Sequence, residues 1–399
     1  MKTILFVAGG IETVPAIRRA KEKGMFTVVS DGSAAAPGFS VADASFVADT
    51  YDVAATIHGA RALGRNLDGV IAVGADVPRT VAGVAAAFGL PGISERAAQL
   101  ASDKLAMKEA LDAAGVPVPW FRFVPDLACL KAIAHFRGFP LVLKPVDSRG
   151  ARGVLLLRSG GPDLKWAFET ATAESPTGRV MVEQFIRGPQ ISSEALVLRG
   201  EAVTVGLADR NYARLQEFAP YIIEDGGQMP TEQPAEVCRA ISDVMTHCAH
   251  ALGIKTGALK GDIVISNGEP VVIEVAARLS GGYFCTHLIP LSTGVDFVGA
   301  ALDQAVGLTV SPEALRPAHE RGVAQRYLFP PPGVVSSVSV PNPLPSGVEM
   351  LEVRVSPGDS VPPVTGHPSR GGVVITAADT REEALRVAEA VVGAVRIET

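Results

Sequence analysis

Largely apolar runs and amphipathic segments alternate along the first part of the chain. Strands are predicted for 3–8, 26–31 and 69–74, and helices for 12–24 and 78–89, each ending on a glycine. Because these strand runs show no polar face, they are typical of a parallel sheet that helices cover on both sides. The pattern predicts a doubly wound α/β domain over residues 1–93.

A second unit begins near Ser94. Residues 94–115 predict two helices with a break at Ser102, where Ser102 or Asp103 can cap the second helix. Residues 120–187 hold short apolar runs with one or two helices, including the segment 162–175. We expect this stretch to form a small β-rich subdomain.

Glycine turns then mark two hairpins. One is centred on Arg199-Gly200 and the other on Asn267-Gly268, a dipeptide that strongly favours a tight hairpin turn. A helix is predicted between them, over 234–253. Together these features predict a second α/β domain over 94–310, with its subdomain at about 120–187.

The last segment, 311–399, is at first rich in proline, which favours loops and edge strands. Short strands are predicted for 349–355 and 371–377, followed by a helix that begins at Thr380. The segment predicts a small α+β C-terminal domain.

Composition narrows the class of protein. The 399 residues suffice for two or three domains, and the net charge of -6 argues against nucleic acid as a partner. Four scattered cysteines without a C-x-x-C pair suggest neither disulfides nor zinc. No apolar run approaches the roughly 18 residues of a membrane span, and the N-terminus resembles a buried strand more than a signal peptide. We therefore expect a soluble, cytoplasmic protein.

Gly9-Gly10 follows the first strand, and Asp31 ends the second. This placement suggests a dinucleotide site, but the segment lacks G-x-G-x-x-G. A tight turn is the simpler interpretation, and a small anion at the helix N-terminus stays open. His247 and His250 lie three residues apart on a predicted helix, yet no third zinc ligand is near in sequence.

Asp262 and Glu274 lie on the two strands of the Asn267-Gly268 hairpin. Residues paired across this turn have numbers that sum to about 535 or 536, so the two carboxylates can face each other. Like charges opposite each other repel, and a Mg²⁺ ion between them would remove the repulsion. The alternative is that both are exposed. Arg278, four residues after Glu274, can bind a phosphate or carboxylate, or form a surface ion pair.

The loop KPVDSRGARGV, residues 144–154, connects two apolar runs. It is either a simple hairpin turn or a loop whose glycines let backbone N–H groups approach phosphate oxygens.

Taken in order, SDKLAMKEAL, LVLKPVDSRGARGV, VMVEQFI and GDIV…VVIEVAAR resemble the ATP-grasp superfamily. The resemblance is to its carboxylate–amine ligases, related to biotin carboxylase, purine transformylase and the L-amino-acid ligases. It covers nearly the whole chain and implies a pre-ATP-grasp domain, an ATP-grasp domain with a lid subdomain, and a small C-terminal domain.

The resemblance also implies roles for individual residues. It assigns ATP binding to Lys104, Lys144, Ser148, Arg149, Gly150, Gly153, Glu183, Gln184, Phe185 and Ile186, and ribose binding to Gln190 or Glu194. It assigns Mg²⁺ or Mn²⁺ to Asp262 and Glu274, catalysis to Arg278 and Lys144, and substrate binding to Gly10, Glu12, Asp76, Arg278, Gly281 and Gly282. Three positions depart from the family pattern: Gln190, Asp262 and Ala276.

The implied reaction activates a carboxylate as an acyl phosphate and couples it to an amine, with release of ADP and phosphate. The segment EVAARLSGG favours amino acids as substrates. A carboxylase or formyl-phosphate enzyme of nucleotide metabolism, and a nucleotide-binding protein without ligase activity, are the alternatives. Small-molecule carboxylates and amines are the expected partners, and a homodimer is an open alternative.

Overall fold

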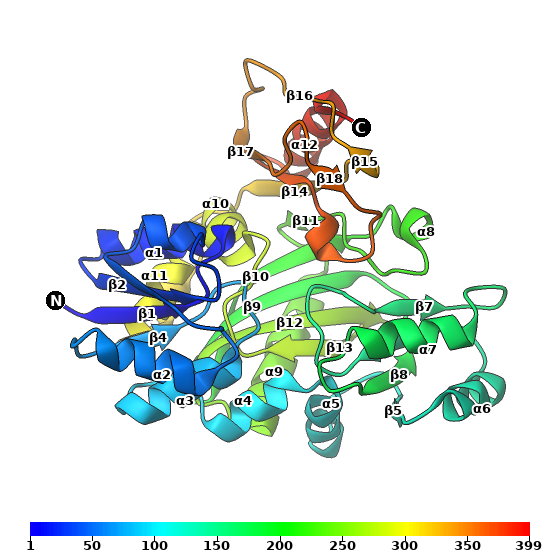
Figure 1. Ribbon diagram of the computed structural model, residues 1–399, viewed down its shortest axis with the longest axis horizontal. Coiled ribbons are helices and arrows are strands. Elements are labelled where there is room, and N and C mark those ends of the chain that lie inside the picture. The colour runs from blue at the N-terminus through cyan, green and yellow to red at the C-terminus, as the bar shows by residue number, and fades with distance from the viewer.

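The computed structural model describes residues 1–399 as three large sheets and two small two-stranded ones, with surrounding helices (Figure 1). The N-terminal sheet has four parallel strands, the lid sheet has four antiparallel strands, and an eight-stranded antiparallel sheet runs through the centre. In Figure 1 the N-terminal sheet lies at the left, the lid at the right and the C-terminal strands at the top.

The N-terminal domain is a parallel sheet in the order β3-β2-β1-β4. Its strands are β1 (Thr3–Val7), β2 (Phe26–Asp31), β3 (Ala44–Val47) and β4 (Gly69–Ile71), with helices α1 (Val14–Glu22), α2 (Val53–Ala62) and α3 (Pro78–Phe88). All five residues of β1 are buried. The predicted strands and helices are confirmed. The sequence did not reveal β3 and α2, because β3 is a short edge strand and α2 has only a weak apolar stripe.

The second unit begins with two capped helices, α4 (Glu95–Ser102) and α5 (Lys104–Ala113). Ser94 caps α4, and the Asp103 carboxylate accepts hydrogen bonds from the first backbone N–H groups of α5. The predicted break at Ser102 is confirmed, and Asp103 is the cap.

The lid subdomain follows as β5 (Phe121–Val124), α6 (Leu127–Arg137), β6 (Leu141–Pro145), β7 (Leu155–Leu157), α7 (Leu164–Ala173) and β8 (Val180–Gln184). Its sheet has the order β5-β8-β6-β7 and packs α6 and α7 around an apolar core of its own. The short strands and the helix 162–175 expected in this stretch are present.

The central sheet has the order β13-β12-β9-β10-β11-β14-β19-β17. Its first part comprises β9 (Gln190–Leu198), β10 (Glu201–Asn211), β11 (Gly226–Met229), β12 (Thr256–Ser266) and β13 (Glu269–Ala276), with helices α8 (Leu215–Phe218), α9 (Ala235–Leu252), α10 (Ile289–Thr293) and α11 (Phe297–Ala305). Both predicted hairpin turns are present, and their four central residues have positive φ angles of 53° to 96°.

An irregularity changes the register of the second hairpin. Asp262 pairs with Glu274, but the next residue, Ile263, pairs with Val272. The extra residue, Ile273, is a β-bulge, which turns the strand locally. Regular alternation along β13 predicts Val272 on the same face as Glu274. This prediction is wrong, because the bulge leaves Val272 in the core beneath α9 while Glu274 faces the cleft.

The C-terminal strands continue the central sheet across the predicted boundary at 310. They are β14 (Gly322–Leu328), β15 (Gly333–Val334), β16 (Ser337–Ser339), β17 (Val348–Val353), β18 (Ser360–Val361), β19 (Gly372–Ala378) and β20 (Arg396–Glu398), with helix α12 (Arg381–Ala394) capped by Thr380. β14, β19 and β17 add to the sheet through β11. The largest apolar core accordingly joins β1, α11 and β19.

None of the helices is both long enough and apolar enough to span a bilayer.

Candidate active site

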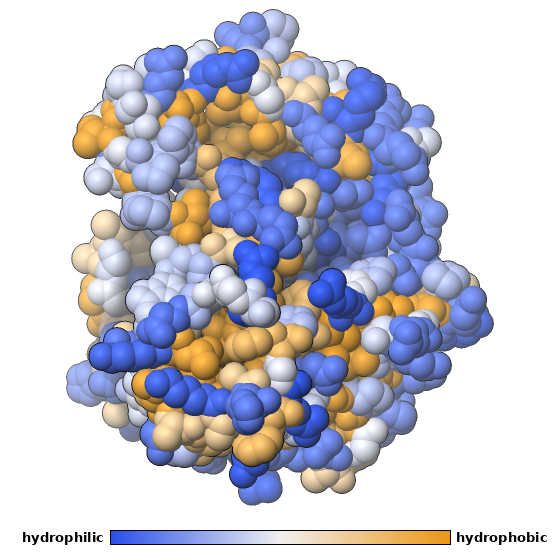
Figure 2. All heavy atoms as spheres, turned by 90° about the vertical axis from the view of Figure 1, so that its right-hand side faces the viewer, coloured by the Kyte–Doolittle hydropathy of each residue, from blue (hydrophilic) through white to orange (hydrophobic).

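A polar cleft of about 550 Å³ lies where the three sheets meet. Figure 2 shows hydrophilic side chains gathered around a hollow on this face of the molecule. Nine lysine and arginine side chains and six carboxylates line the cleft, so it carries a formal excess of three positive charges. A fixed excess of this sign attracts a polyanion.

The lid end of the cleft contains a buried group of three charges. Glu183 on β8 lies between Lys144 of β6, at 2.7 Å, and Lys108 of α5, at 2.9 Å. All three side chains are almost fully buried. Burial lowers the pKa of Lys108 to about 8, against the opposing effect of Glu183. Burial alone would raise the pKa of Glu183, but the two ammonium groups outweigh it and lower that pKa. The group therefore keeps a net positive charge facing the cleft.

The segment after β8 offers free backbone groups. Gln184, Phe185 and Ile186 line the cleft, and neither Phe185 nor Ile186 donates a backbone hydrogen bond within the protein. A second cavity of about 680 Å³ adjoins here and shares Phe185, Ile186 and Gln190 with the cleft. Backbone donors beside an apolar wall suit a flat heterocycle such as adenine.

The β6–β7 loop covers the cleft. Lys104 donates a hydrogen bond to the backbone oxygen of Ser148 at 2.8 Å, and Ser148 Oγ donates to the backbone oxygen of Arg152. Gly150 and Ala151 both have positive φ angles, of 63° and 58°, which turn the loop sharply. Ser148, Arg149 and Gly150 line the cleft as predicted.

The loop also contacts both neighbouring domains. The Arg149 guanidinium stacks on the Tyr51 ring, 3.9 Å from its centroid. On the other side, the backbone N–H of His367 donates to the backbone oxygen of Gly150 at 2.9 Å. The loop therefore closes over the cleft and is not a free hairpin turn.

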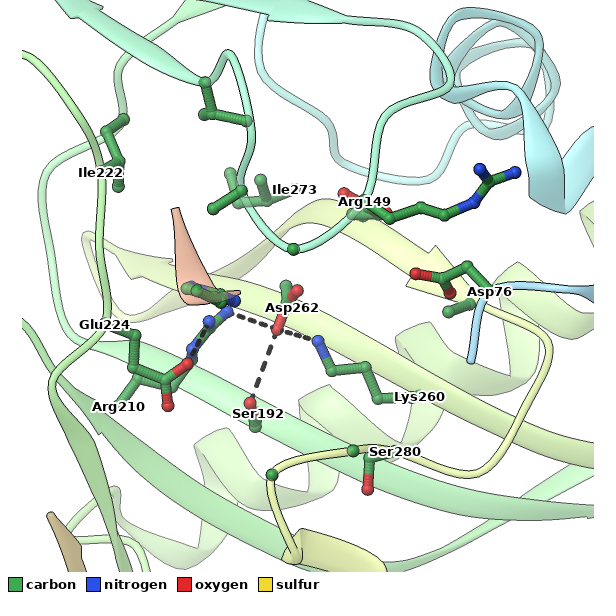
Figure 3. A pocket seen from close by; sticks show the side chains of 18 of the residues that line it. Asp76, Arg149, Ser192, Arg210, Ile222, Glu224, Lys260, Asp262, Ile273 and Ser280 are labelled. Carbon is green, nitrogen blue, oxygen red and sulfur yellow. Dashed lines mark hydrogen bonds and ion pairs between the residues drawn. The ribbon is translucent and has the colours of Figure 1, made fainter. Parts of the chain in front are cut away.

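The predicted carboxylate pair lies on the floor of the cleft. Asp262 and Glu274 face each other across the β12–β13 ladder. Asp262 Oδ1 accepts from Arg210 at 2.6 Å and pairs with Lys260 at 2.5 Å, as Figure 3 shows. Glu274 Oε1 lies 3.3 Å from Lys104.

These carboxylates fit a divalent cation. Asp262 Oδ2 and Glu274 Oε2 make no hydrogen bond within the protein, and both residues line the cleft. No group of three or more His, Cys, Asp or Glu side chains occurs that could hold a metal ion by itself. Mg²⁺ commonly uses one or two carboxylates and takes its other ligands from phosphate and water, so two suffice.

The opposite end of the cleft is formed by the N-terminal domain and the 278–282 segment. Gly74 donates its backbone N–H to Leu279, and this contact brings Asp76 within 2.5 Å of Arg278 Nε. Burial alone would raise the pKa of Asp76, but Arg278 outweighs it and lowers the pKa to about 2. Both groups therefore stay charged at neutral pH.

Glu12 completes this end. Its Oε2 accepts from the backbone N–H of Gly282 at 2.6 Å, and its Oε1 lies 3.4 Å from Arg354, just after β17. Glu12, Asp76, Arg278, Gly281 and Gly282 all line the cleft. The predicted substrate residues therefore meet, and a C-terminal arginine joins them.

Three predicted residues do not line the cleft. Glu194 is fully buried; its Oε1 accepts from the backbone N–H of Ser280 at 3.0 Å, and burial raises its pKa to about 7. An inaccessible side chain cannot bind ribose, so Gln190, which lines the cleft, is the better candidate. Gly10 lies outside the lining, and Gly153 is a buried turn residue whose Cβ would clash with Glu174.

Sequence reasoning missed several charged residues of the site. These are Lys108, Arg210, Glu224, Lys260, Arg354 and Arg370. Lys260 could have been found, because it lies two residues before Asp262 and so shares its strand face. Arg210, Glu224 and Arg370 come from three separate segments that only the sheet order brings together.

Other candidates take structural roles. Asp31 accepts from the backbone N–H groups of Gly9 and Ser33, which stabilises the turn after β1. The four cysteines are free, and Cys248 and Cys285 are buried. His250 is exposed beside Glu201.

Two family models match the chain: the ATP-grasp domain over residues 101–282 and the L-amino acid ligase C-terminal domain 2 over residues 326–399. A D-alanine–D-alanine ligase of Gloeobacter violaceus is 31% identical over 226 residues, which are 53% of this chain and 70% of that protein. The chain belongs to the ATP-grasp family. Its named relatives in that family are ligases, and the resemblance seen in the sequence is confirmed.

Two further relatives match a larger part of this chain. The uncharacterized protein y4rH of Sinorhizobium fredii is 28% identical over 351 residues, 84% of this chain and 70% of that protein. The crystal structure of an L-amino acid ligase from Bacillus licheniformis superposes with a TM-score of 0.82 at 22% identity, over 100% of this chain and 98% of that one. The multidomain ATP-grasp fold is therefore shared over the full length.

Proposed function

We propose that this ATP-grasp ligase uses ATP to activate the carboxylate of an amino acid as an acyl phosphate, and couples it to the amine of a second amino acid. ADP and phosphate are the other products. The observation that carries the proposal is one continuous cleft. Lysines suited to phosphate line its lid end, and charged side chains of both signs line its opposite end.

The lid end supports the nucleotide half of the reaction. Phosphoryl transfer depends on positioning and charge neutralisation more than on a protein nucleophile. Lys104, Lys144 and the N–H groups of the closed loop supply positive charge where the ATP phosphates would lie, and Phe185 and Ile186 offer backbone groups to adenine. A loop over the cleft would also limit the access of water, which hydrolyses an acyl phosphate.

Asp262 and Glu274 would hold Mg²⁺ or Mn²⁺. Such an ion, when bound, supplies charge neutralisation for the phosphate oxygens. Arg210 and Lys260 position Asp262, Lys104 lies beside Glu274, and one oxygen of each carboxylate takes part in no hydrogen bond within the protein.

The opposite end supports amino acids as substrates. An amino acid carries a carboxylate and an ammonium group, and each needs a partner of opposite charge. Arg278 and Arg354 can meet a carboxylate, while Glu12 and Asp76 can meet an ammonium group. The match of residues 326–399 to an L-amino acid ligase domain supports the same substrate class.

Release of ADP tests the proposal. Purified protein with ATP and Mg²⁺ should release ADP only when a suitable pair of amino acids is present, and a dipeptide should form in equal amount. Glu274→Gln should abolish this release, whereas Glu269→Gln, on the exposed hairpin end of the same strand, should not. Release that is unchanged in Glu274→Gln would refute the metal assignment.

A second candidate is a nucleotide-binding protein without ligase activity. Ala276 and Gln190, which depart from the family pattern, favour it. Binding of ATP without release of ADP, across all amino acid pairs, would support that candidate. Release of ADP that depends on bicarbonate or formate and not on amino acids would instead indicate a carboxylase or formyl-phosphate enzyme.

A further inference from the structure

Asp262 is already neutralised by the protein. Its Oδ1 receives Arg210 at 2.6 Å and Lys260 at 2.5 Å, and Ser192 Oγ lies 3.5 Å away. Figure 3 shows the guanidinium and the ammonium converging on this carboxylate from opposite sides. Two cations on one oxygen reduce the attraction of that carboxylate for a third.

Arg210 is held in this position from its other side. Its second terminal nitrogen pairs with Glu224 at 2.5 Å, and its side chain is only 10% exposed. Arg370 binds the backbone oxygen of Glu224 at 2.8 Å. Moving Arg210 away would leave two largely buried carboxylates without this partner, which is costly. The contact with Asp262 is therefore a fixed part of the cleft.

Glu274 has a different environment. Its one salt bridge is to Lys104, at the longer distance of 3.3 Å, and its side chain is 32% exposed against 20% for Asp262. Beside it, Ala276 presents only a methyl group to the cleft. Of the two carboxylates, Glu274 keeps the greater capacity for an incoming divalent cation.

We infer that the two carboxylates have unequal roles: the cleft takes one divalent ion, held mainly by Glu274, while Arg210 and Lys260 on Asp262 form a fixed cationic wall for the phosphates. This inference rests on the proposed function for the nucleotide. Asp262 then positions Arg210 and Lys260 as much as it binds metal. Unlike a metal ion, the positive charge of these side chains is already in place and does not have to be bound from solution.

Titration of Mn²⁺ into the protein with ADP, followed by electron paramagnetic resonance, tests the inference. We expect one ion per chain, a loss of affinity of about tenfold or more in Glu274→Gln, and a change of at most about threefold in Asp262→Asn. Two ions per chain, or equal losses in both variants, would overturn it.

Arg210→Met gives the sharper test, because it frees Asp262. We expect Mn²⁺ to bind about threefold or more tightly, while the rate of ADP release falls. Arg210→Lys, which keeps the charge, should restore affinity toward the wild-type value. Arg214→Met removes a half-buried arginine outside the cleft, paired with Glu217, and should change neither quantity. Unchanged Mn²⁺ affinity in Arg210→Met would contradict the inference.

Lys260→Met repeats the test from the other cation, in case Arg210→Met does not fold. The outcome is separable from that of the proposed function. Mn²⁺ binding with the expected variant pattern, but no ADP release with any amino acid pair, would leave the inference standing and refute the ligase. Absence of Mn²⁺ binding to the wild-type ADP complex would overturn both.

Discussion

Several charged side chains of the cleft are buried and shared between two partners. Glu183 is shared by two lysines, and Arg210 by two carboxylates. A group of three such charges has a net charge. Burying it costs free energy unless the protein holds every member in a well-formed contact. The side-chain contacts of these residues were hard to predict because their partners are distant in sequence. Lys108, for example, resembles an ordinary polar position of a helix, and only the packing of α5 against β13 and β5, with Glu183 of β8 as its partner, buries it.

Lys108→Met should weaken both the fold and nucleotide binding. The change removes one partner of the buried Glu183 and cancels the net charge of the group. We expect the free energy of unfolding to fall by about 2 kcal/mol and the KM for ATP to rise. Urea denaturation and ADP-release kinetics measure the two effects. Lys165→Met, at an exposed position of α7, is the control and should change neither. An unchanged KM would show that Lys108 has no role toward ATP.

Glu194 should make stability depend on pH. Burial raises its pKa from 4.5 to about 7 in the folded chain. Between these values the unfolded chain has lost the proton and the folded chain keeps it, so stability falls as the pH rises. Glu194→Gln has no carboxyl proton at this position and lacks the effect. As the pH rises from 4.5 to 8, the free energy of unfolding of the variant should therefore increase relative to that of the wild type by on the order of 3 kcal/mol. Urea denaturation across this range measures the free energy of unfolding of both proteins. If it depended on pH in the same way for the wild type and the variant, the raised pKa of Glu194 would be contradicted.

Local elements were predicted best where glycine determines the backbone. The two hairpins and the helix ends at Gly89 and Gly253 follow from residues that tolerate positive φ. The bulge at Ile273 could not be predicted, because no local signal marks an extra residue within a strand. It matters for the site, since it decides which residues of β13 face the cleft.

Gly150→Ala tests the covering loop. A Cβ fits there, 3.5 Å from Pro368, but the φ of 63° makes alanine cost about 1 kcal/mol. We expect the KM for ATP to rise several-fold with little loss of fold. Gly160→Ala, at a φ of 67° in the open turn after β7, should lose the same stability and leave ATP binding unchanged. Equal KM values for both variants would mean that the loop does not bind ATP. Gly153 is unsuitable, because its Cβ would lie 2.9 Å from Glu174.

The central sheet runs without a break across position 310, where the sequence pattern predicted a domain boundary. The domain types were predicted from hydrophobic pattern, and the cleft from the resemblance, but the pattern treated residues after 310 as a separate unit. Pairing of β11 with β14 is a contact across nearly one hundred residues, and no periodicity in either strand reports it. That pairing brings Arg354 and Arg370 to the cleft.

A chain that ends at Arg321 should therefore fail to fold. The truncation leaves β11 as an unpaired edge and removes Val323, Tyr327 and Ile375 from the largest apolar core. We expect an insoluble product, or one without a cooperative thermal transition by circular dichroism. A soluble fragment that unfolds cooperatively and binds ATP would show that the C-terminal strands are a separate domain.

Formation of an acyl phosphate is the central claim, and transfer of oxygen-18 tests it most directly. An amino acid labelled in its carboxylate oxygens is incubated with ATP, Mg²⁺, a second amino acid and the protein, and the released phosphate is analysed by mass spectrometry. Attack of the amine on an acyl phosphate expels phosphate together with one carboxylate oxygen, so each phosphate should carry one labelled atom. Unlabelled phosphate, or label recovered in AMP, would contradict the account.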